Sequence, residues 1–69
     1  MTDTKELKTR INDSGLKLTA IAESLGLTRQ ALWNKIENVN EFKASEIAAL
    51  ADILHLTENE ATNIFLRSK

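Results

Sequence analysis

The chain has 69 residues, of which 42% are apolar and 28% are charged. This length leaves room for one small core and excludes a catalytic domain joined to a regulatory one, and the composition excludes a disordered or membrane-spanning chain. There are 10 Leu, 8 Ala and 6 Ile against one Val, two Gly and no Pro, so we expect a single all-α domain over residues 1–69. The absence of Cys excludes disulfide bridges and thiolate metal sites, and without a long apolar run we expect a cytoplasmic protein.

The formal net charge of −1 is distributed unevenly along the chain. Residues 1–35 carry six basic and four acidic side chains, whereas residues 36–69 carry three basic and six acidic ones. A mixed, solvated surface could also give so modest a difference. If any part of the chain faces phosphate groups, we expect it to be the first half.

A first helix is predicted from about Thr4 to Asp13, because Leu7 and Ile11 lie four positions apart and share one face. The small residues Ser14-Gly15 should end it. The second predicted helix is shorter, with Thr19 as its N-cap and Ile21 facing inward.

A third helix is predicted from Thr28, as N-cap, through Glu37, with Leu32 and Ile36 as its inward pair. Only Gly26-Leu27-Thr28 connects it to the second helix, so the turn between them must be tight.

The polar stretch Asn38–Lys43 is predicted to be a loop pinned to the core by Val39 and Phe42. The next helix has the most regular apolar pattern in the chain, at i, i+3, i+4 and i+7. Its predicted inward residues are Ile47, Leu50, Ala51 and Leu54.

Thr57-x-x-Glu60 is a capping box, which predicts a fifth helix extending to about Arg67. Three consecutive apolar residues near its end cannot all face one core, and we expect Leu66 to be the exposed one. Because domains of this size often gain stability by association, this segment is our predicted dimer or partner interface. That interface consists of Ile64, Phe65 and Leu66.

Between Thr19 and Ile36 the sequence reads T-A-I-A-E-S-L-G-L-T-R-Q-A-L-W-N-K-I. Helices joined by so short a turn cross at close range, so a small contact residue is needed, and Ala22 is small. Four positions later, Gly26 can adopt a left-handed conformation that costs other residues roughly 1–2 kcal/mol. Leu32 then packs the later helix on the earlier one. With this helix-turn-helix spacing at about residues 19–37, the chain resembles the lambda-repressor-like family of phage repressors, Cro proteins and small phage-encoded regulators.

The resemblance implies a compact bundle of about five short helices that binds double-stranded operator DNA as a homodimer, with half-sites about 34 Å apart and the third helix in the major groove. On a helical wheel at about 100° per residue, Gln30 and Asn34 lie opposite the inward face. Amide side chains can pair with adenine, and Arg with guanine. The predicted base-contacting residues are Arg29, Gln30, Trp33 and Asn34.

Some of these assignments have alternatives. Gln30 and Asn34 are also typical of any solvated helix face. Trp33, which only the resemblance places at the DNA, could instead pack on Phe42 or Val39, and we expect it to be partly buried.

Phosphate contacts are expected from helix N-termini and nearby lysines. Many members of the family have an aliphatic residue three positions after Leu32, where this chain has Lys35 and places its apolar residue one later, at Ile36. Glu37 is expected to point away from the DNA. The predicted phosphate-contacting residues are Lys17, Thr19, Thr28 and Lys35.

A second function stays open, namely a phage modulator or antirepressor that keeps the helix-turn-helix fold but binds a partner repressor protein. The acidic second half of the chain and the few bases near the motif favour it. An enzyme is not expected, because there is no Cys, no Tyr and no glycine-rich phosphate loop. The single His55 is expected at the surface, and no cofactor, metal or membrane partner is expected.

Overall fold

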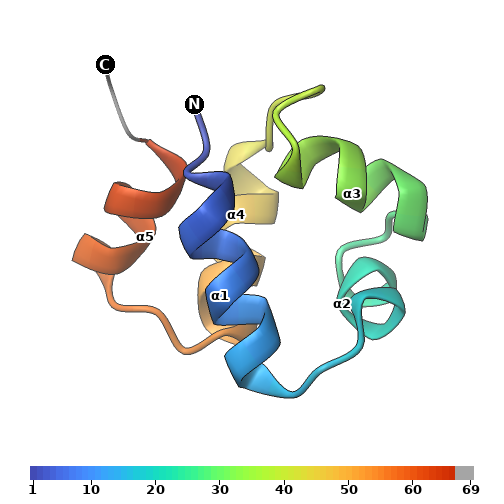
Figure 1. The fold of residues 1–69 in the computed structure, drawn as a ribbon, viewed down its shortest axis with the longest axis horizontal. Coiled ribbons are helices and arrows are strands. Elements are labelled where there is room, and N and C mark those ends of the chain that lie inside the picture. The colour runs from blue at the N-terminus through green and yellow to red at the C-terminus, as the bar shows by residue number, and fades with distance from the viewer. Residues whose placement is uncertain (67–69) are drawn as a thin grey trace.

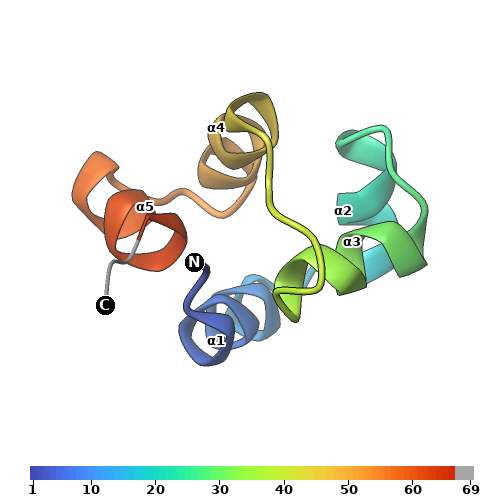
Figure 2. The same ribbon diagram turned by 90° about the horizontal axis from the view of Figure 1, so that it is seen from above.

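The computed structural model describes residues 1–66, which form five helices and, within that range, no strand. The helices are α1 (Thr4–Ser14), α2 (Leu18–Ser24), α3 (Arg29–Ile36), α4 (Ala44–Ile53) and α5 (Glu58–Phe65). Both ribbon views place α5 and the α2–α3 pair at opposite ends of the molecule, with α1 and α4 between them (Figures 1 and 2). The all-α expectation is confirmed for this part of the chain.

Local sequence signals set both ends of α1. Asp3 is the N-cap, and its carboxylate accepts a hydrogen bond from Glu6 N at 3.2 Å. After the helix, Gly15 adopts a φ of 73° and donates its N–H to Asn12 O at 3.2 Å. The prediction of a helix from about Thr4 to Asp13 is therefore confirmed to within one residue.

The predicted start of α2 is wrong, because Lys17 and not Thr19 is the N-cap. Lys17 O accepts the hydrogen bond from Ile21 N at 3.1 Å, and Thr19 is an exposed residue within the first turn. Leu18, the first helical residue, packs against the core. Burying a leucine contributes about 1.5–3 kcal/mol when complete, whereas a hydroxyl cap contributes about 1 kcal/mol, so packing sets this boundary.

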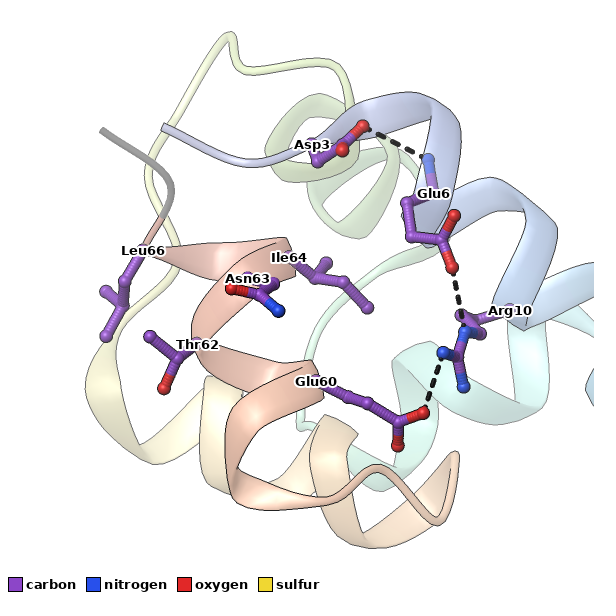
Figure 3. Close-up of a pocket in the computed structure, with 8 residues that line it drawn as sticks. All are labelled: Asp3, Glu6, Arg10, Glu60, Thr62, Asn63, Ile64 and Leu66. Carbon is purple, nitrogen blue, oxygen red and sulfur yellow. Dashed lines mark hydrogen bonds and ion pairs between the residues drawn. The ribbon is translucent and has the colours of Figure 1, made fainter. Parts of the chain in front are cut away.

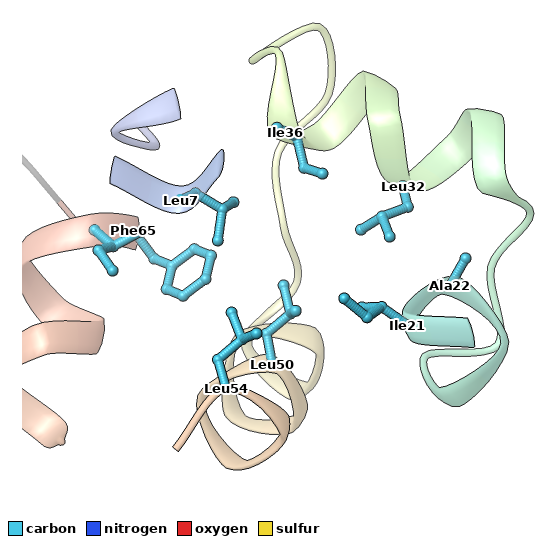
Figure 4. Close-up of a cluster of buried hydrophobic side chains, with 9 residues drawn as sticks. Leu7, Ile21, Ala22, Leu32, Ile36, Leu50, Leu54 and Phe65 are labelled. Carbon is cyan, nitrogen blue, oxygen red and sulfur yellow. The ribbon is translucent and has the colours of Figure 1, made fainter. Parts of the chain in front are cut away.

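One apolar core joins the five helices. The small Ala22 is 1% exposed and lies against the core, which allows α2 to approach α3 closely. Leu50 of α4 and its C-cap Leu54 are buried as predicted, whereas Ile47 and Ala51 are only half-buried. The buried apolar residues are Leu7, Ile21, Ala22, Leu32, Ile36, Leu50, Leu54, Ile64 and Phe65 (Figure 4).

The loop between α3 and α4 is held by Phe42 and not by Val39. The Phe42 ring packs edge-on against Phe65 with centroids 5.3 Å apart, whereas Val39 is 67% exposed. The reason is the turn after α3, where Asn38 has a φ of 65° and Val39 N donates to Asn34 O at 2.8 Å. This backbone arrangement is a Schellman motif.

The capping box at Thr57–Glu60 is present, with Glu60 N donating to Thr57 Oγ1 at 3.1 Å. Ile64 and Phe65 are buried in the core, so the prediction that they form an interface is wrong. Leu66, in contrast, is 63% exposed, as expected. The predicted helix end at Arg67 lies outside the described residues.

Candidate nucleic-acid interface

The connection between α2 and α3 is a tight turn centred on Gly26. Gly26 has a φ of 71°, its N–H donates to Glu23 O at 3.0 Å, and Leu27 N donates to Ala22 O at 2.9 Å. These two bonds define a Schellman motif, which needs a residue in the left-handed conformation where Gly26 stands. Residues 19–36 therefore do not form one continuous helix, and α3 leaves the turn in a new direction (Figure 1).

Thr28 caps α3 as predicted. Its Oγ1 accepts a hydrogen bond from Ala31 N at 3.1 Å, and Thr28 O accepts from Leu32 N at 3.0 Å. The inward residues Leu32 and Ile36 are fully buried. With the inner face fixed in this way, the opposite face of α3 is turned toward solvent.

The outer face of α3 carries a hydrogen-bonded amide pair. Arg29 and Gln30 are exposed and Asn34 is half-buried. Gln30 Nε2 donates to Asn34 Oδ1 at 2.9 Å, so the two amides lie side by side. Each still has donor and acceptor capacity for another molecule. The structure thus brings together Gln30 and Asn34, the two residues that the helical wheel places opposite the inward face, and Arg29 lies exposed at the start of the same helix.

Trp33 lies on the α1 side of α3. Lys8 Nζ is 4.8 Å from the centroid of the Trp33 ring, and the ring helps line a groove with Ile11 and Leu16. The expected partial burial is confirmed, but the interpretation that Trp33 packs on Phe42 or Val39 is wrong. The reason is the place of the ring beside α1, where Lys8 lies over it and Ile11 lines the same groove.

Glu37, directly after α3, pairs with Lys8 of α1 at 2.6 Å. The carboxylate therefore lies beside α1, in agreement with the expectation that it points away from the outer face of α3. Lys8 in turn joins two residues at the C-terminal end of α3, because it also lies over Trp33.

Lys35 is not available for a phosphate. Its Nζ donates to Glu46 Oε1 at 2.6 Å, and the two side chains are only 11% and 9% exposed. Burial raises the pKa of Glu46, but hydrogen bonds from Lys35 Nζ and Lys43 N outweigh this effect and hold the pKa below its usual value of 4.5. The predicted phosphate contact from Lys35 is therefore wrong, because a neighbouring helix already neutralises its charge.

Of the other predicted phosphate contacts, Lys17, Thr19 and Thr28 are exposed. Three of the six basic residues in the first half of the chain are engaged in ion pairs with acids, which are Lys8, Arg10 and Lys35. Within residues 1–66, the basic side chains outside ion pairs are Lys5, Lys17, Arg29 and Lys43.

Arg10 links α1 to α5 and is not singled out by the sequence. It donates from Nε to Glu6 at 2.9 Å and from Nη2 to Glu60 at 2.8 Å (Figure 3). Hydrogen bonds from Thr57 N and Arg10 lower the pKa of Glu60. The i, i+4 spacing of Glu6 and Arg10 signals the first pair, whereas the second depends on tertiary contact.

Large apolar side chains are exposed near the N-terminus and the end of α5. Met1 is 68% exposed and Leu66 63%, and both line a hollow whose walls include Phe42 and Ile47. Val39, in the loop after α3, is also exposed. Only Leu66 is predicted to be exposed from the sequence, since Met1 and Val39 have no periodic pattern that would reveal their position.

Comparison of the chain with protein-family models, curated proteins and solved structures finds no match. In the described part of the chain, no helix has the length and apolar character required to cross a bilayer. Residues 1–66 also contain no group of three His, Asp or Glu side chains placed to hold a metal ion.

Proposed function

We propose that the chain is a sequence-specific DNA-binding transcriptional regulator in which α2 and α3 form a helix-turn-helix motif and α3 enters the major groove. The observation that carries the proposal is the Gly26 turn, which separates two short helices while the buried Leu32 and Ile36 turn the outer face of α3 to solvent. The exposed face has the width of one helix, as the major groove requires.

The chemistry of that face supports direct readout. The coupled amides of Gln30 and Asn34 offer donors and acceptors together, the combination that adenine presents in the major groove. Arg29, exposed at the start of α3, suits guanine. Holding Gln30 and Asn34 together before binding reduces the side-chain entropy lost in the complex.

The proposed function includes a homodimer that presents its two α3 helices about 34 Å apart, one turn of duplex. Each copy has a longest principal extent of 29 Å. The exposed Leu66 remains the candidate contact between the two copies, and Met1, which lines the same hollow, is added to it. Ile64 and Phe65 are buried and are no longer candidates.

A second candidate function is supported by the charge distribution. Lys17 and Arg29 are the basic residues outside ion pairs on the α2–α3 segment of the described chain, and the affinity of proteins for DNA rises with the phosphates they neutralise. A modulator that binds a partner repressor protein needs no such charge. The groove beside Trp33 and the apolar surface at Leu66 would then be candidate contact surfaces.

The deciding experiment is selection from a pool of duplexes with a randomised central segment, using the purified chain. The proposal predicts enrichment of a sequence with two related half-sites, and the fluorescence anisotropy of that duplex, labelled at one end, should rise when the chain is added and fall again with salt. The double variant Gln30→Ala/Asn34→Ala should reduce the preference for the selected sequence while retaining the fold. Failure to enrich any sequence, together with binding to a repressor protein, would favour the second candidate.

A further inference from the structure

The C-terminal end of α3 forms ion pairs with distant parts of the chain, whereas its first turn forms none within residues 1–66. Lys35 pairs with Glu46 of α4, and Glu37 pairs with Lys8 of α1, each at 2.6 Å. At the other end, Arg29 is exposed, and no ion pair involves it in the described structure. Ion pairs with other parts of the fold therefore hold the C-terminal end of α3, whereas its start is held, in the described part of the chain, by the Thr28 cap alone among side-chain polar contacts.

The pair between Lys35 and Glu46 is the least exposed of these contacts. Its two residues come from different helices, and Glu46 Oε1 also accepts a hydrogen bond from Lys43 N at 2.8 Å, in the first turn of α4. Since this carboxylate is held by its own helix, the Lys35 ammonium has one defined position. Breaking a buried pair leaves a buried charge without its partner, which strongly disfavours alternative positions.

The apolar contacts on the inner side of α3 are less directional than its ion pairs or the hydrogen bond from Thr4 Oγ1 to Ile36 O at 2.6 Å. Leu32 and Ile36 are buried among apolar side chains, which tolerate small rotations because dispersion contacts have little directionality. A hydrogen-bonded ion pair has a preferred distance and angle. Lys35 follows Asn34 directly, so a rotation of α3 that displaces one displaces the other by the same angle.

We propose that the pair between Lys35 and Glu46 is a positioning device that fixes the rotation of α3 about its own axis and thereby aims Gln30 and Asn34. That Gln30 and Asn34 are directed at DNA bases rests on the proposed function, whereas the constraint on the rotation of α3 does not. Neither Lys35 nor Glu46 contacts a base in this mechanism, and both are positioning residues.

The test is the double variant Lys35→Met/Glu46→Gln. It removes both charges together, and the amide introduced in place of the Glu46 carboxylate keeps a side-chain oxygen that can accept the Lys43 N–H bond. The chain offers a matched control in Arg10→Met/Glu60→Gln. Glu60 likewise caps its own helix, through Thr57 N at 2.8 Å, and pairs with a base on another helix, but this pair links α1 to α5.

In the free protein, we expect the amide NMR signals of residues 29–36 to shift and broaden by exchange in Lys35→Met/Glu46→Gln and to stay unchanged in the control. With the duplex selected by the wild-type chain, we expect the first variant to lose about tenfold or more of its preference over a scrambled duplex, which is comparable to losing one bidentate base contact. The control should retain its preference.

Unchanged shifts and relaxation along α3 in the folded variant would overturn the proposal. Loosened α3 signals with full sequence preference would overturn the link to readout. If the wild-type chain selects no duplex, the proposed function fails while the NMR comparison still decides the positioning role. If the double variant does not fold, Lys35→Arg, which keeps both charges of the buried pair but changes the position and geometry of the donor, replaces it in both measurements.

Discussion

His55 and Asn38 adopt nearly the same left-handed conformation, with φ values of 56° and 65°, each directly after the last turn of a helix. Their side chains differ in what they do there. Asn38 exchanges hydrogen bonds with the backbone of Thr2, whereas His55 is exposed and, within residues 1–66, its side chain forms no hydrogen bond. Substitution by glycine is therefore expected to have opposite effects on stability at these two positions.

We predict that His55→Gly raises the free energy of unfolding by about 0.5–1 kcal/mol. Glycine removes the strain of a Cβ at positive φ, and this gain exceeds the entropy that it adds to the unfolded chain. Urea unfolding followed by circular dichroism measures the change. His55→Ala is the control and should show no gain, because it retains the Cβ. A lower midpoint for His55→Gly would contradict the account.

At Asn38 the balance is reversed, and Asn38→Gly should lower the free energy of unfolding by about 1–2 kcal/mol. The side chain accepts from Thr2 N at 3.0 Å and donates to Thr2 O at 2.9 Å, and each bond is worth about 1 kcal/mol net. Asparagine also tolerates this conformation well, so glycine gains little there. The same urea titration applies, and an increase in stability would show that these bonds contribute nothing.

At this scale the sequence predicts the caps at Thr28 and Thr57, because each depends on residues within one turn. It does not predict the pair between Lys35 and Glu46, whose members are eleven positions apart and meet only once α3 packs on α4. From the sequence alone, Lys35 is therefore interpreted as a basic residue at the surface.

The helices differ in how far local signals define them. Helices α1, α3 and α5 each begin at a residue whose side chain caps the helix, and the sequence predicts the positions of these helices closely. The start of α2 has no such cap and is set by burial of Leu18, which only the folded core provides. The direction of Trp33 toward Lys8 is likewise a result of packing, since the sequence contains equally plausible apolar partners in the following loop.

For the α2–α3 element we predict that Gly26→Ala costs about 1–2 kcal/mol of stability and also weakens selected-duplex binding. No atom lies within 4 Å of a Cβ built at Gly26, so the cost comes from the backbone conformation alone. Gly15→Ala is a matched control, with a φ of 73° and equally open surroundings. Both variants should lose similar stability in urea, but only Gly26→Ala should change binding. Equal effects on binding would mean that stability, and not the turn, controls it.

Across the whole molecule, acid sensitivity should come from Glu46 and Glu60. Their pKa values are lower in the folded state than the usual 4.5, so the folded protein binds these protons more weakly than the unfolded chain. The stability that these two carboxylates add to the folded protein is complete above the usual pKa of 4.5. It is lost as the pH falls through their lower pKa values in the folded state. The free energy of unfolding should thus be nearly constant from about pH 7 to 5 and fall below about pH 4.5. The Lys35→Met/Glu46→Gln variant should show a shallower decline in urea titrations across this range.

The charge of the molecule is also distributed differently in space than along the sequence. The first half of the chain has six bases, but ion pairs with acids outside their own helices engage Lys8, Arg10 and Lys35. The sequence shows how many bases there are but not which of them face solvent. Any electrostatic attraction to DNA therefore depends on fewer cations than the composition suggests.

This reduced number predicts a weak salt dependence for duplex binding. If Lys17 of each protomer contacts a phosphate and Arg29 reaches a base in the groove, a dimer brings about four positive charges to the duplex, and log Kobs should fall with log salt concentration at a slope of roughly −3.6. Lys17→Ala should reduce the slope by about 2 per dimer, whereas Lys35→Met/Glu46→Gln should leave it unchanged, because that pair is neutral and buried. Fluorescence titrations at several salt concentrations measure both. A slope steeper than this in the wild-type chain, which becomes shallower in Lys35→Met/Glu46→Gln, would mean that Lys35 leaves Glu46 to bind a phosphate in the complex.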